Sequence, residues 1–558
     1  MRIYQSATLD VPRDLNLTEL LHQHAGNVDL PGSHLIAKDD VNNRSLTIGA
    51  LRRRGGRLAN GLQKHFQPPD QARWMIVVPN SVDYVEIIHS VLWLGGVACP
   101  VNHALVVAET AHAMTVARPF AIIVCTSERS KVLQAVDVAA KELQSQDVAW
   151  AQPHIISAIE HVDGLFHFPE DFLDYTPLPI PHHQDASTRV ATIHLSSGTT
   201  GKPKGVKLSH HNYVANCFQL YHHDPAQWPP NLRQIAYTPY VHIAQTMPVA
   251  FFGPWIGMMY QAMATYDTQA YARLVESNQC TDHLLLPTVA MALMSSDVMQ
   301  RYDFSRSRTF TAGQLSMTEQ QISELVGKAP WQMMRLYGMT EASPYIAYSR
   351  LNQTLPHGAI GPLLPGLEVM LKLANGDDAP EGGPGELWVR GPNVTRGYVF
   401  NDAATKSAFP LKDWYNSGDL CTISKEGMLS VVGRTKELIK YKGFQISPVE
   451  LEACLGPHPL VADGAVGAVY DAVQMTEVPI AYVVLADANA TQAERKRALQ
   501  DIHAAVDKQV SGYKRLRGGV WEVTELPRNA TGKFVRRDLH KGKTGLGSLD
   551  DGNRLAKL

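Results

Sequence analysis

The stretch from Ser196 to Gly205 is the feature that most narrows what this chain can fold into. It reads Ser-Ser-Gly-Thr-Thr-Gly-Lys-Pro-Lys-Gly and follows an apolar, β-prone run over 190–195 that predicts a buried strand. Glycine lets a backbone approach an anion closely, and hydroxyls with freed N–H groups can surround phosphate oxygens. The composition alone would suit a solvated loop, but a strand leading into glycines, hydroxyls and lysines is typical of a nucleotide site.

The N-terminal part of the chain carries further strand–helix patterns. An apolar run at 74–78 is followed by a Pro-Asn-Ser turn and by apolar residues at helical spacing, and a second apolar run lies at 120–125. These patterns predict a layered α/β domain. Because 558 residues exceed what a single hydrophobic core holds, we expect two or more domains.

Composition excludes several classes of protein. A formal net charge of -2 gives no case for nucleic acid as a general partner, and the scattered cysteines without a C-x-x-C pair suit reduced thiols in an intracellular protein. Residues 1–16 lack the apolar centre of a secretory signal. The apolar stretch 241–266 is interrupted by prolines and glutamines, so it predicts a buried helix rather than a transmembrane one. The basic run Arg52 to Arg54 predicts a solvated helix face.

Further motifs with plausible chemistry follow along the chain. Residues 337–341 read Tyr-Gly-Met-Thr-Glu, in which a tyrosine face can stack on a purine, a hydroxyl can bond a phosphate and a carboxylate can hold magnesium. Residues 415–419 read Tyr-Asn-Ser-Gly-Asp, and a carboxylate at the last position could accept from both hydroxyls of a ribose. Residues 433–445 begin Gly-Arg-Thr-Lys-Glu, and residues 527–533 read Pro-Arg-Asn-Ala-Thr-Gly-Lys.

In this order the motifs resemble those of the adenylate-forming superfamily, which includes acyl-CoA synthetases, aryl-CoA ligases, luciferases and peptide-synthetase adenylation domains. The resemblance covers essentially the whole chain, and the motifs are most similar to those of 4-coumarate–CoA-ligase-like enzymes. It implies an α/β fold with a large multi-subdomain N-terminal domain over 1–435, a small α+β lid over 436–540, and a flexible tail over 541–558. A pivot at Lys436 would rotate the lid.

The resemblance also assigns roles to individual residues. Lys533 would contact the substrate carboxylate and the α-phosphate, Thr340 the phosphate, and Glu341 magnesium, while His242 would close over the substrate carboxylate. Coenzyme A would meet Lys442, Gly443 and Phe444, and the acyl pocket would include His242, Ala244, Leu336 and Met339. ATP would be held by Ser196, Ser197, Gly198, Thr199, Thr200, Gly201, Lys204, Gly313, Gln314, Tyr337, Asp419, Arg434 and Gln445.

Three positions depart from the commoner family pattern. Gln314 stands where alanine is frequent, Ser417 replaces the usual threonine, and Leu336 stands where many aryl ligases carry glycine. A leucine at that position should shorten or redirect the acyl pocket. Peptide-synthetase adenylation domains usually place an aspartate near the acyl helix to hold an amine, and none lies between Val241 and Thr265, which argues against an amino-acid substrate.

The resemblance therefore implies an ATP-dependent acid–CoA ligase that uses Mg²⁺ and coenzyme A, with a hydrophobic aryl or medium-length acid as substrate. A luciferase-like oxidoreductase, an adenylation enzyme that loads a carrier protein, and an inactive nucleotide-binding homologue are the alternatives. The chain ends Ala556-Lys557-Leu558, which resembles the peroxisomal address Ser-Lys-Leu and predicts a peroxisomal protein recognised by the import receptor.

Overall fold

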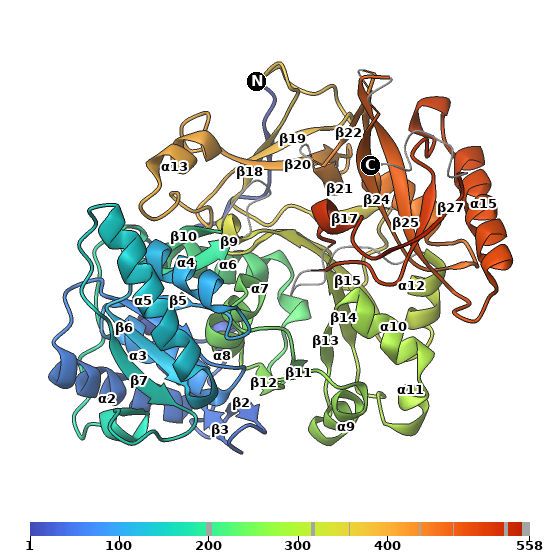
Figure 1. Ribbon diagram of the computed structural model, residues 1–558. Helices are drawn as coiled ribbons and strands as arrows, with labels where there is room; N and C mark the ends of the chain where they lie inside the picture. Colours follow the sequence, from blue (N-terminus) through green and yellow to red (C-terminus); the bar gives the residue numbers. More distant parts are fainter. Residues whose placement is uncertain are drawn as a thin grey trace.

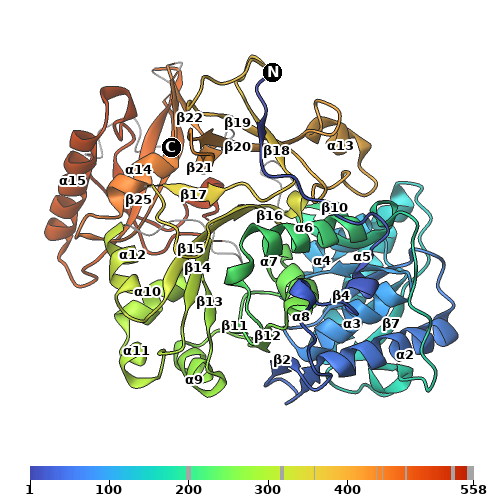
Figure 2. The same cartoon turned by 180° about the vertical axis from the view of Figure 1, so that it is seen from behind.

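The computed structural model describes residues 1–196, 203–313, 319–356, 358–434, 437–442, 444–471, 474–528 and 534–549. These residues form a large N-terminal α/β domain built on four sheets and a smaller C-terminal domain with helices of its own, which confirms the predicted fold class. Figures 1 and 2 both place the C-terminal sheet, coloured orange to red, beside strands β17 (Ala359–Pro362) and β21 (Met428–Arg434).

The first sheet confirms the three strands that the sequence predicted. Its order is β10-β9-β5-β4-β6-β7-β8, and all neighbours run parallel except β9 and β10, which form an antiparallel pair. Its strands are β4 (Arg73–Val77), β5 (Val97–Pro100), β6 (Ala121–Cys125), β7 (His154–Ala158), β8 (His167–Phe168), β9 (Val190–Ser196) and β10 (Lys204–Ser209).

Helices pack around this sheet, and α3 is the most deeply buried of them, since every one of its side chains is buried. The hydroxyl of Ser81 caps α3 by accepting from the backbone N–H of Tyr84 at 3.3 Å. The helices of this region are α1 (Leu17–Leu20), α2 (Ile48–Phe66), α3 (Val82–Trp93), α4 (Val107–Ala117), α5 (Arg129–Ser145) and α6 (His210–His223).

Two four-stranded sheets follow, one of order β11-β12-β2-β3 and one of order β13-β14-β15-β16. In the second, β13, β14 and β15 are parallel, so their carboxyl ends meet at one edge, where open α/β sheets bind ligands. The strands are β2 (Leu35–Asp39), β3 (Ser45–Thr47), β11 (Arg233–Ala236), β12 (Met259–Ala262), β13 (Asp282–Leu285), β14 (Thr309–Gly313), β15 (Gln332–Gly338) and β16 (Tyr345–Tyr348). The helices beside them are α9 (Thr268–Asn278), α10 (Pro287–Ser295), α11 (Val298–Arg301) and α12 (Glu319–Val326).

The fourth sheet of the large domain is antiparallel throughout and has the order β1-β18-β19-β20-β21-β17. It closes the domain on the side of the C-terminal sheet (Figure 1). Its remaining elements are β1 (Tyr4–Gln5), β18 (Glu368–Lys372), β19 (Gly385–Arg390), β20 (Tyr415–Ile423) and the neighbouring helix α13 (Asp402–Ala408).

The apolar stretch at 241–266 is a buried helical segment, as predicted, that leads into β12. It consists of α7 (Ile243–Thr246), a π-helical turn η6 (Met247–Phe252) and α8 (Gly253–Ile256). Such π-turns are rare and occur frequently at functional sites. In the described part of the chain, no helix combines the length and the apolar character needed to span a bilayer.

The C-terminal domain has two hydrophobic clusters of its own. It contains the hairpin β22 (Ile439–Tyr441) and β23 (Phe444–Ile446), and the sheet β24 (Val461–Asp471), β25 (Thr476–Leu485), β26 (Val520–Val523) and β27 (Lys543–Gly547), with helices α14 (Pro448–Leu455) and α15 (Gln492–Gln509).

Strand β27 corrects the prediction that a flexible tail begins at residue 541. It pairs antiparallel with β26, and the ammonium group of Lys543 lies 4.8 Å from the ring centre of Trp521. The hydroxyl of Ser548 donates to or accepts from the imidazole of His503 at 2.9 Å and accepts from the backbone of Val520. The aromatic side chains of the lid therefore hold a segment whose glycine-rich composition suggested disorder.

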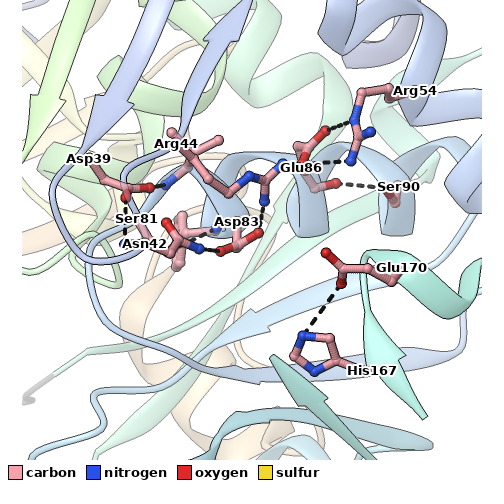
Figure 3. A network of polar contacts seen from close by, with 12 residues as sticks. Asp39, Asn42, Arg44, Arg54, Ser81, Asp83, Glu86, Ser90, His167 and Glu170 are labelled. Carbon is pink, nitrogen blue, oxygen red and sulfur yellow. Dashed lines mark hydrogen bonds and ion pairs between the residues drawn. The ribbon is translucent and has the colours of Figure 1, made fainter. Parts of the chain in front are cut away.

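The basic run at 52–54 is also not a fully solvated face. Arg54 pairs with the fully buried carboxylate of Glu86, which Arg44 contacts as well, and Arg44 also pairs with Asp83 (Figure 3). Arg52 donates to the backbone oxygen of Leu21. Buried carboxylates need such partners because an unpaired buried charge is strongly destabilising. The sequence prediction was wrong here because α3 carries acidic residues on a buried helix, opposite the arginines.

Candidate functional site

The glycine-rich loop is anchored at both ends by paired strands. Ser196 ends β9 and lies opposite Lys204, which begins β10, so the sheet holds the two ends of the loop side by side. The loop residues Ser197, Gly198, Thr199, Thr200 and Gly201 lie outside the described residues. The described flanks therefore bring both ends of the predicted anion-binding stretch to one point of the sheet.

Lys204 and Glu341 both contact the side chain of Tyr398. Thr340 and Glu341 form a short 3₁₀ turn, η7 (Thr340–Ala342), immediately after β15, and Glu341 is buried. The hydroxyl of Tyr398 donates to Oε1 of Glu341 at 3.0 Å, and the ammonium group of Lys204 lies 5.1 Å from the ring centre of Tyr398. Tyr398 is held in place by a backbone bridge to Val206 of β10.

Burial and then the charge of Glu341 raise the pKa of Tyr398 above its ordinary value, so this phenol remains a donor. Tyr415 lies beside it, and burial followed by Glu341 raises the pKa of Tyr415 as well. Sequence reasoning missed Tyr398. It lies far from the motifs along the chain, and no pattern around it signals a site; only the pairing of β10 with the segment at 398 brings it to Glu341.

A second cluster joins three predicted residues from three strands. The hydroxyl of Tyr337 on β15 donates to Oδ2 of Asp419 on β20 at 2.6 Å, and Nε of Arg434 on β21 lies 2.9 Å from Oδ1 of the same carboxylate. Asp419 and Arg434 face each other in the ladder of β20 and β21. Burial and the Asp419 carboxylate raise the pKa of Tyr337 well above its ordinary value. Burial alone would lower the pKa of Arg434, but Asp419 and Glu437 outweigh it and raise that pKa.

His242 begins helix α7, and its Nδ1 accepts from the backbone N–H of Ala244 at 3.2 Å. Behind it lies His194 of β9, whose Nδ1 is 3.1 Å from the backbone oxygen of Val241 and whose Nε2 is 3.0 Å from the hydroxyl of Tyr213. Burial lowers the pKa of His194 to about 3, so this imidazole is neutral and acts as a fixed support for the turn that carries His242.

A cavity of about 60 Å³ lies between the α7–η6 helix and the sheet of β13 to β16. Ala244 and Leu336 line it, as the predicted acyl pocket requires, whereas His242 and Met339 are not among the described residues that line it. Leu336 lies opposite Gly313, the last residue of β14, at the carboxyl ends of the strands. The neighbouring Gln314 lies outside the described residues.

The predicted pivot joins β21 to the C-terminal domain. The backbone oxygen of Arg434 accepts from the N–H groups of Glu437 and Leu438 at 3.0 and 3.1 Å, while Lys436 itself lies outside the described residues. Beyond the pivot, Lys442 follows β22, and its backbone N–H donates to the hydroxyl of Thr476 at 2.9 Å. Phe444 and Gln445 belong to β23, and Gly443 lies outside the described residues.

Lys533 also lies outside the described residues, but Arg528 and Phe534 on either side of it are described. Arg528 and Phe534 form a backbone bridge on either side of the loop, and the Arg528 guanidinium donates to both oxygens of Asp463 at 2.9 Å. Arg536, three positions after Lys533, pairs with Glu437 at 2.9 Å and with Glu452. The described residues on either side of Lys533 are therefore tied to the C-terminal domain, and Arg536 is tied through Glu437 to the segment that follows the pivot.

The described residues fit the predicted nucleotide and metal. Mg²⁺ is usually held by one or two protein carboxylates together with phosphate and water oxygens. Glu341 offers one such carboxylate, in which Oε2 has no hydrogen-bond partner among the described residues while Oε1 is held by Tyr398. Asp419 retains acceptor capacity beyond its contacts with Tyr337 and Arg434, because each carboxylate oxygen can accept two hydrogen bonds.

Comparison with known proteins finds two family matches. Residues 30–399 match the model of the AMP-binding enzyme family, and residues 450–533 match the model of the AMP-binding enzyme C-terminal domain. The chain is 29% identical over 484 residues to a probable 4-coumarate–CoA ligase 1 of Dictyostelium discoideum, covering 83% of this chain and 84% of that protein. It is 29% identical over 509 residues to 4-coumarate:CoA ligase 1 of Petunia hybrida, covering 89% of each.

Solved structures share the fold at lower identity. ATP-bound MatB from Rhodopseudomonas palustris superposes with a TM-score of 0.79 at 24% identity, covering 94% of this chain and 98% of that one. The anthranilate CoA ligase AuaEII in complex with anthranoyl-AMP gives a TM-score of 0.79 at 21% identity, covering 94% and 96%.

Proposed function

This chain belongs to the AMP-binding enzyme family, and from that premise we propose that it is an ATP-dependent carboxylic acid–CoA ligase, forming an acyl-adenylate and then a thioester. The observation that carries the proposal is the convergence of Lys204, Tyr398 and Glu341 at one point, with Tyr337, Asp419 and Arg434 forming a separate cluster nearby in the same domain. The first cluster suits phosphates with a cation, and the second suits a ribose.

In the first half-reaction the substrate carboxylate attacks the α-phosphorus of ATP and pyrophosphate leaves. Charge builds up on the α-phosphoryl oxygens, so fixed donors and cations provide most of the acceleration. Lys533 contacts the carboxylate and the α-phosphate, Thr340 donates to the phosphate, and the loop from Ser196 to Lys204 holds the departing pyrophosphate. When bound at Glu341, Mg²⁺ supplies charge neutralisation on the phosphates.

In the second half-reaction the thiol of coenzyme A attacks the activated carbonyl carbon and AMP leaves. The lid turns about Lys436, so that Lys533 withdraws and Lys442, Gly443 and Phe444 face the bound adenylate. One pocket can then serve two chemistries. The ion pairs of Arg536 with Glu437 and Glu452 tie the segment that follows Lys533 to the rest of the lid, which supports a movement of the lid as a single body.

We further propose a hydrophobic aryl or medium-length acid as substrate. The helix of α7 and η6 contributes Pro248 and Phe252 to the cavity that Leu336 also lines, and the curated relatives are named as 4-coumarate–CoA ligases. A screen of ATP–pyrophosphate exchange over aromatic and aliphatic acids of graded length tests this choice. Exchange confined to amino acids would contradict it, and light emission with a luciferin or transfer to a carrier protein in preference to CoA would favour the alternatives.

The role of Lys533 separates the two half-reactions. Lys533→Ala should abolish adenylate formation, with a loss on the order of a hundred- to a thousand-fold, yet still convert supplied acyl-adenylate with CoA. Lys508→Ala, at an exposed position on α15, is the matched control. If Lys533→Ala slowed both half-reactions equally, the assignment of Lys533 to adenylate formation would be wrong.

We also propose a peroxisomal location through Ala556, Lys557 and Leu558. A fluorescent protein fused to the N-terminus of the full chain should collect in peroxisomes. Removal of Leu558 should leave the fusion in the cytosol, and an unchanged distribution would contradict the proposal.

A further inference from the structure

Two arginines contact one aromatic ring on the surface of the large domain, apart from the clusters described above. The guanidinium carbon of Arg118 lies 4.0 Å from the ring centre of Phe400, and that of Arg73 lies 5.2 Å from it. Arg73 begins β4, Arg118 follows α4, and Phe400 precedes α13, so three distant parts of the chain meet here. Phe400 is 55% exposed, which leaves the group accessible from solvent.

The two positive charges have no negative partner. Neither guanidinium forms an ion pair with any residue that the structure describes, although both side chains are partly buried. Nε of Arg73 donates to the backbone oxygens of Ala117 and Arg118. Nε of Arg118 is buried and has no hydrogen-bond partner within the described ranges.

This arrangement is electrostatically unfavourable. Burial and then the positive charge of Arg73 lower the pKa of Arg118. A partly buried charge beside a like charge costs free energy, and an unsatisfied buried donor adds to that cost. An anion that bound both guanidiniums would remove both penalties.

The backbone does not explain why these two side chains stand here. φ is +47° at Arg118 and +50° at Phe400, in the left-handed region that favours glycine. Arg118 occupies the C-cap of α4, where its backbone N–H donates to the oxygen of Met114 at 2.7 Å. Glycine is the usual residue at a left-handed C-cap. Such strain clusters at functional sites, so an arginine and a phenylalanine at these positions point to a role of their side chains.

The chemistry of the pair favours a phosphate group. A guanidinium is planar and presents parallel N–H groups that match two oxygens of a phosphate or a carboxylate. Two guanidiniums together carry two positive charges, and a phosphate at neutral pH carries nearly two negative charges. A carboxylate would compensate only one of the two.

We propose that Arg73 and Arg118 form a second anion site, which binds a phosphate group, either free or at the end of a small ester. None of the residues assigned to ATP takes part in it. The site therefore goes beyond the proposed ligase activity and does not depend on it.

Calorimetric titration of the full chain with inorganic phosphate tests the site. The ATP site is first filled with α,β-methylene-ATP, so that phosphate cannot bind there. We expect saturable binding of one phosphate per chain, and about tenfold weaker binding in Arg118→Met, which keeps the length of the side chain and removes its charge. Arg53→Met, at an exposed position on α2, is the matched control and should bind phosphate like the wild type.

Two further ligands identify what is recognised. Glycerol phosphate that binds more tightly than inorganic phosphate would identify an ester as the ligand, and the reverse order would identify the free anion. Acetate that binds as tightly as phosphate would overturn the choice of a doubly charged group. Failure of α,β-methylene-ATP to bind would count against the proposed function, whereas the phosphate titration would still test Arg118.

Thermal unfolding at low ionic strength separates a binding role from a structural one. Because Arg118 and Arg73 repel each other, Arg118→Met without phosphate should unfold at a midpoint no lower than that of the wild type. Phosphate should raise the midpoint of the wild type and not that of the variant. A wild-type protein that does not bind phosphate, or equal binding in Arg118→Met, would overturn the inference. If Arg118→Met fails to fold, Arg118→Lys replaces it, and because it lacks the planar fork it should bind phosphate more weakly than the wild type.

Discussion

Tyr398 donates a hydrogen bond of 3.0 Å from its phenol to Oε1 of Glu341. This contact joins a loop of the fourth sheet to the turn after β15, and it fixes the carboxylate that we assign to magnesium. Lys204 lies over the ring of the same tyrosine, with its ammonium group 5.1 Å from the ring centre. Tyr398 thus contacts both Lys204, at the end of the glycine-rich stretch, and the carboxylate that we assign to magnesium.

Tyr398→Phe removes the hydroxyl while keeping the ring under Lys204. Glu341 then loses its donor and can rotate, so we expect adenylate formation to slow about tenfold and the Mg²⁺ concentration for half-maximal rate to rise. Pyrophosphate release over a magnesium titration measures both effects. Tyr175→Phe, at a side chain that is 96% exposed, should leave them unchanged. A variant with an unaltered magnesium dependence would show that Tyr398 does not position the carboxylate.

Asp419→Asn tests the second cluster. The neutral amide can no longer form an ion pair with Arg434. Asp419 is the buried partner of this pair, and loss of one partner of a buried pair typically costs a few kcal/mol. We expect the KM for ATP to rise at least tenfold and the free energy of unfolding to fall by about 2 kcal/mol. Both are measured against Asp163→Asn, in which the carboxylate is exposed. An unchanged KM would separate Asp419 from nucleotide binding.

The sequence predicted the residues of the site better than the contacts that join residues far apart along the chain. Strand runs and motif order placed Tyr337, Asp419 and Arg434, because hydrophobic periodicity is local and the motifs are contiguous. Tyr398 escaped prediction because its importance comes from contacts with residues far away along the chain. Strand β27 escaped because its glycine-rich composition is typical of disorder, while aromatic packing in the folded lid outweighs that tendency.

Leu336 should limit the size of the acid. Its side chain lines the cavity beside Gly313, where a smaller residue would leave room next to the reacting centre. Across the series Leu336→Ala and Leu336→Gly, we expect kcat/KM for acids with a bulky ring or branch near the carboxylate to rise stepwise relative to slender acids. Rate profiles over a graded set of acids measure the shift. The same profile in all three proteins would mean that Leu336 does not shape the pocket.

The ion-pair network of α3 should matter for stability rather than for chemistry. Glu86 is fully buried between Arg44 and Arg54, so Glu86→Gln leaves Arg54 without this charged partner and leaves Arg44 with Asp83 (Figure 3). We expect the free energy of unfolding to fall by about 3 kcal/mol with KM values near those of the wild type. Denaturant unfolding and exchange kinetics measure the two. Glu160→Gln, an exposed residue, is the control, and a neutral effect of Glu86→Gln on stability would contradict the expectation.

Buried histidines should make the fold sensitive to acid. Burial lowers the pKa of His89 and of His223 to about 4, and of His194, His210 and His283 to about 3. In the unfolded chain the pKa of these imidazoles is near 6.5, so between pH 6.5 and 4 they are protonated in the unfolded state and neutral in the folded state. The unfolded state therefore binds more protons below that pH, and stability must fall as the pH falls from about 6.5 toward 4.

At about 1.4 kcal/mol per pKa unit, each of these histidines should cost about 2 kcal/mol of stability at pH 5 relative to neutral pH. The thermal midpoint should thus decline steadily over this window. His89 donates through Nε2 to the backbone oxygen of Ala250 at 2.7 Å, and in His89→Gln an amide can still make that contact without titrating. The decline should therefore be shallower in His89→Gln than in the wild type. A midpoint that is flat from pH 6.5 to 4.5, or an identical slope in the two proteins, would mean that these imidazoles are protonated in the folded state.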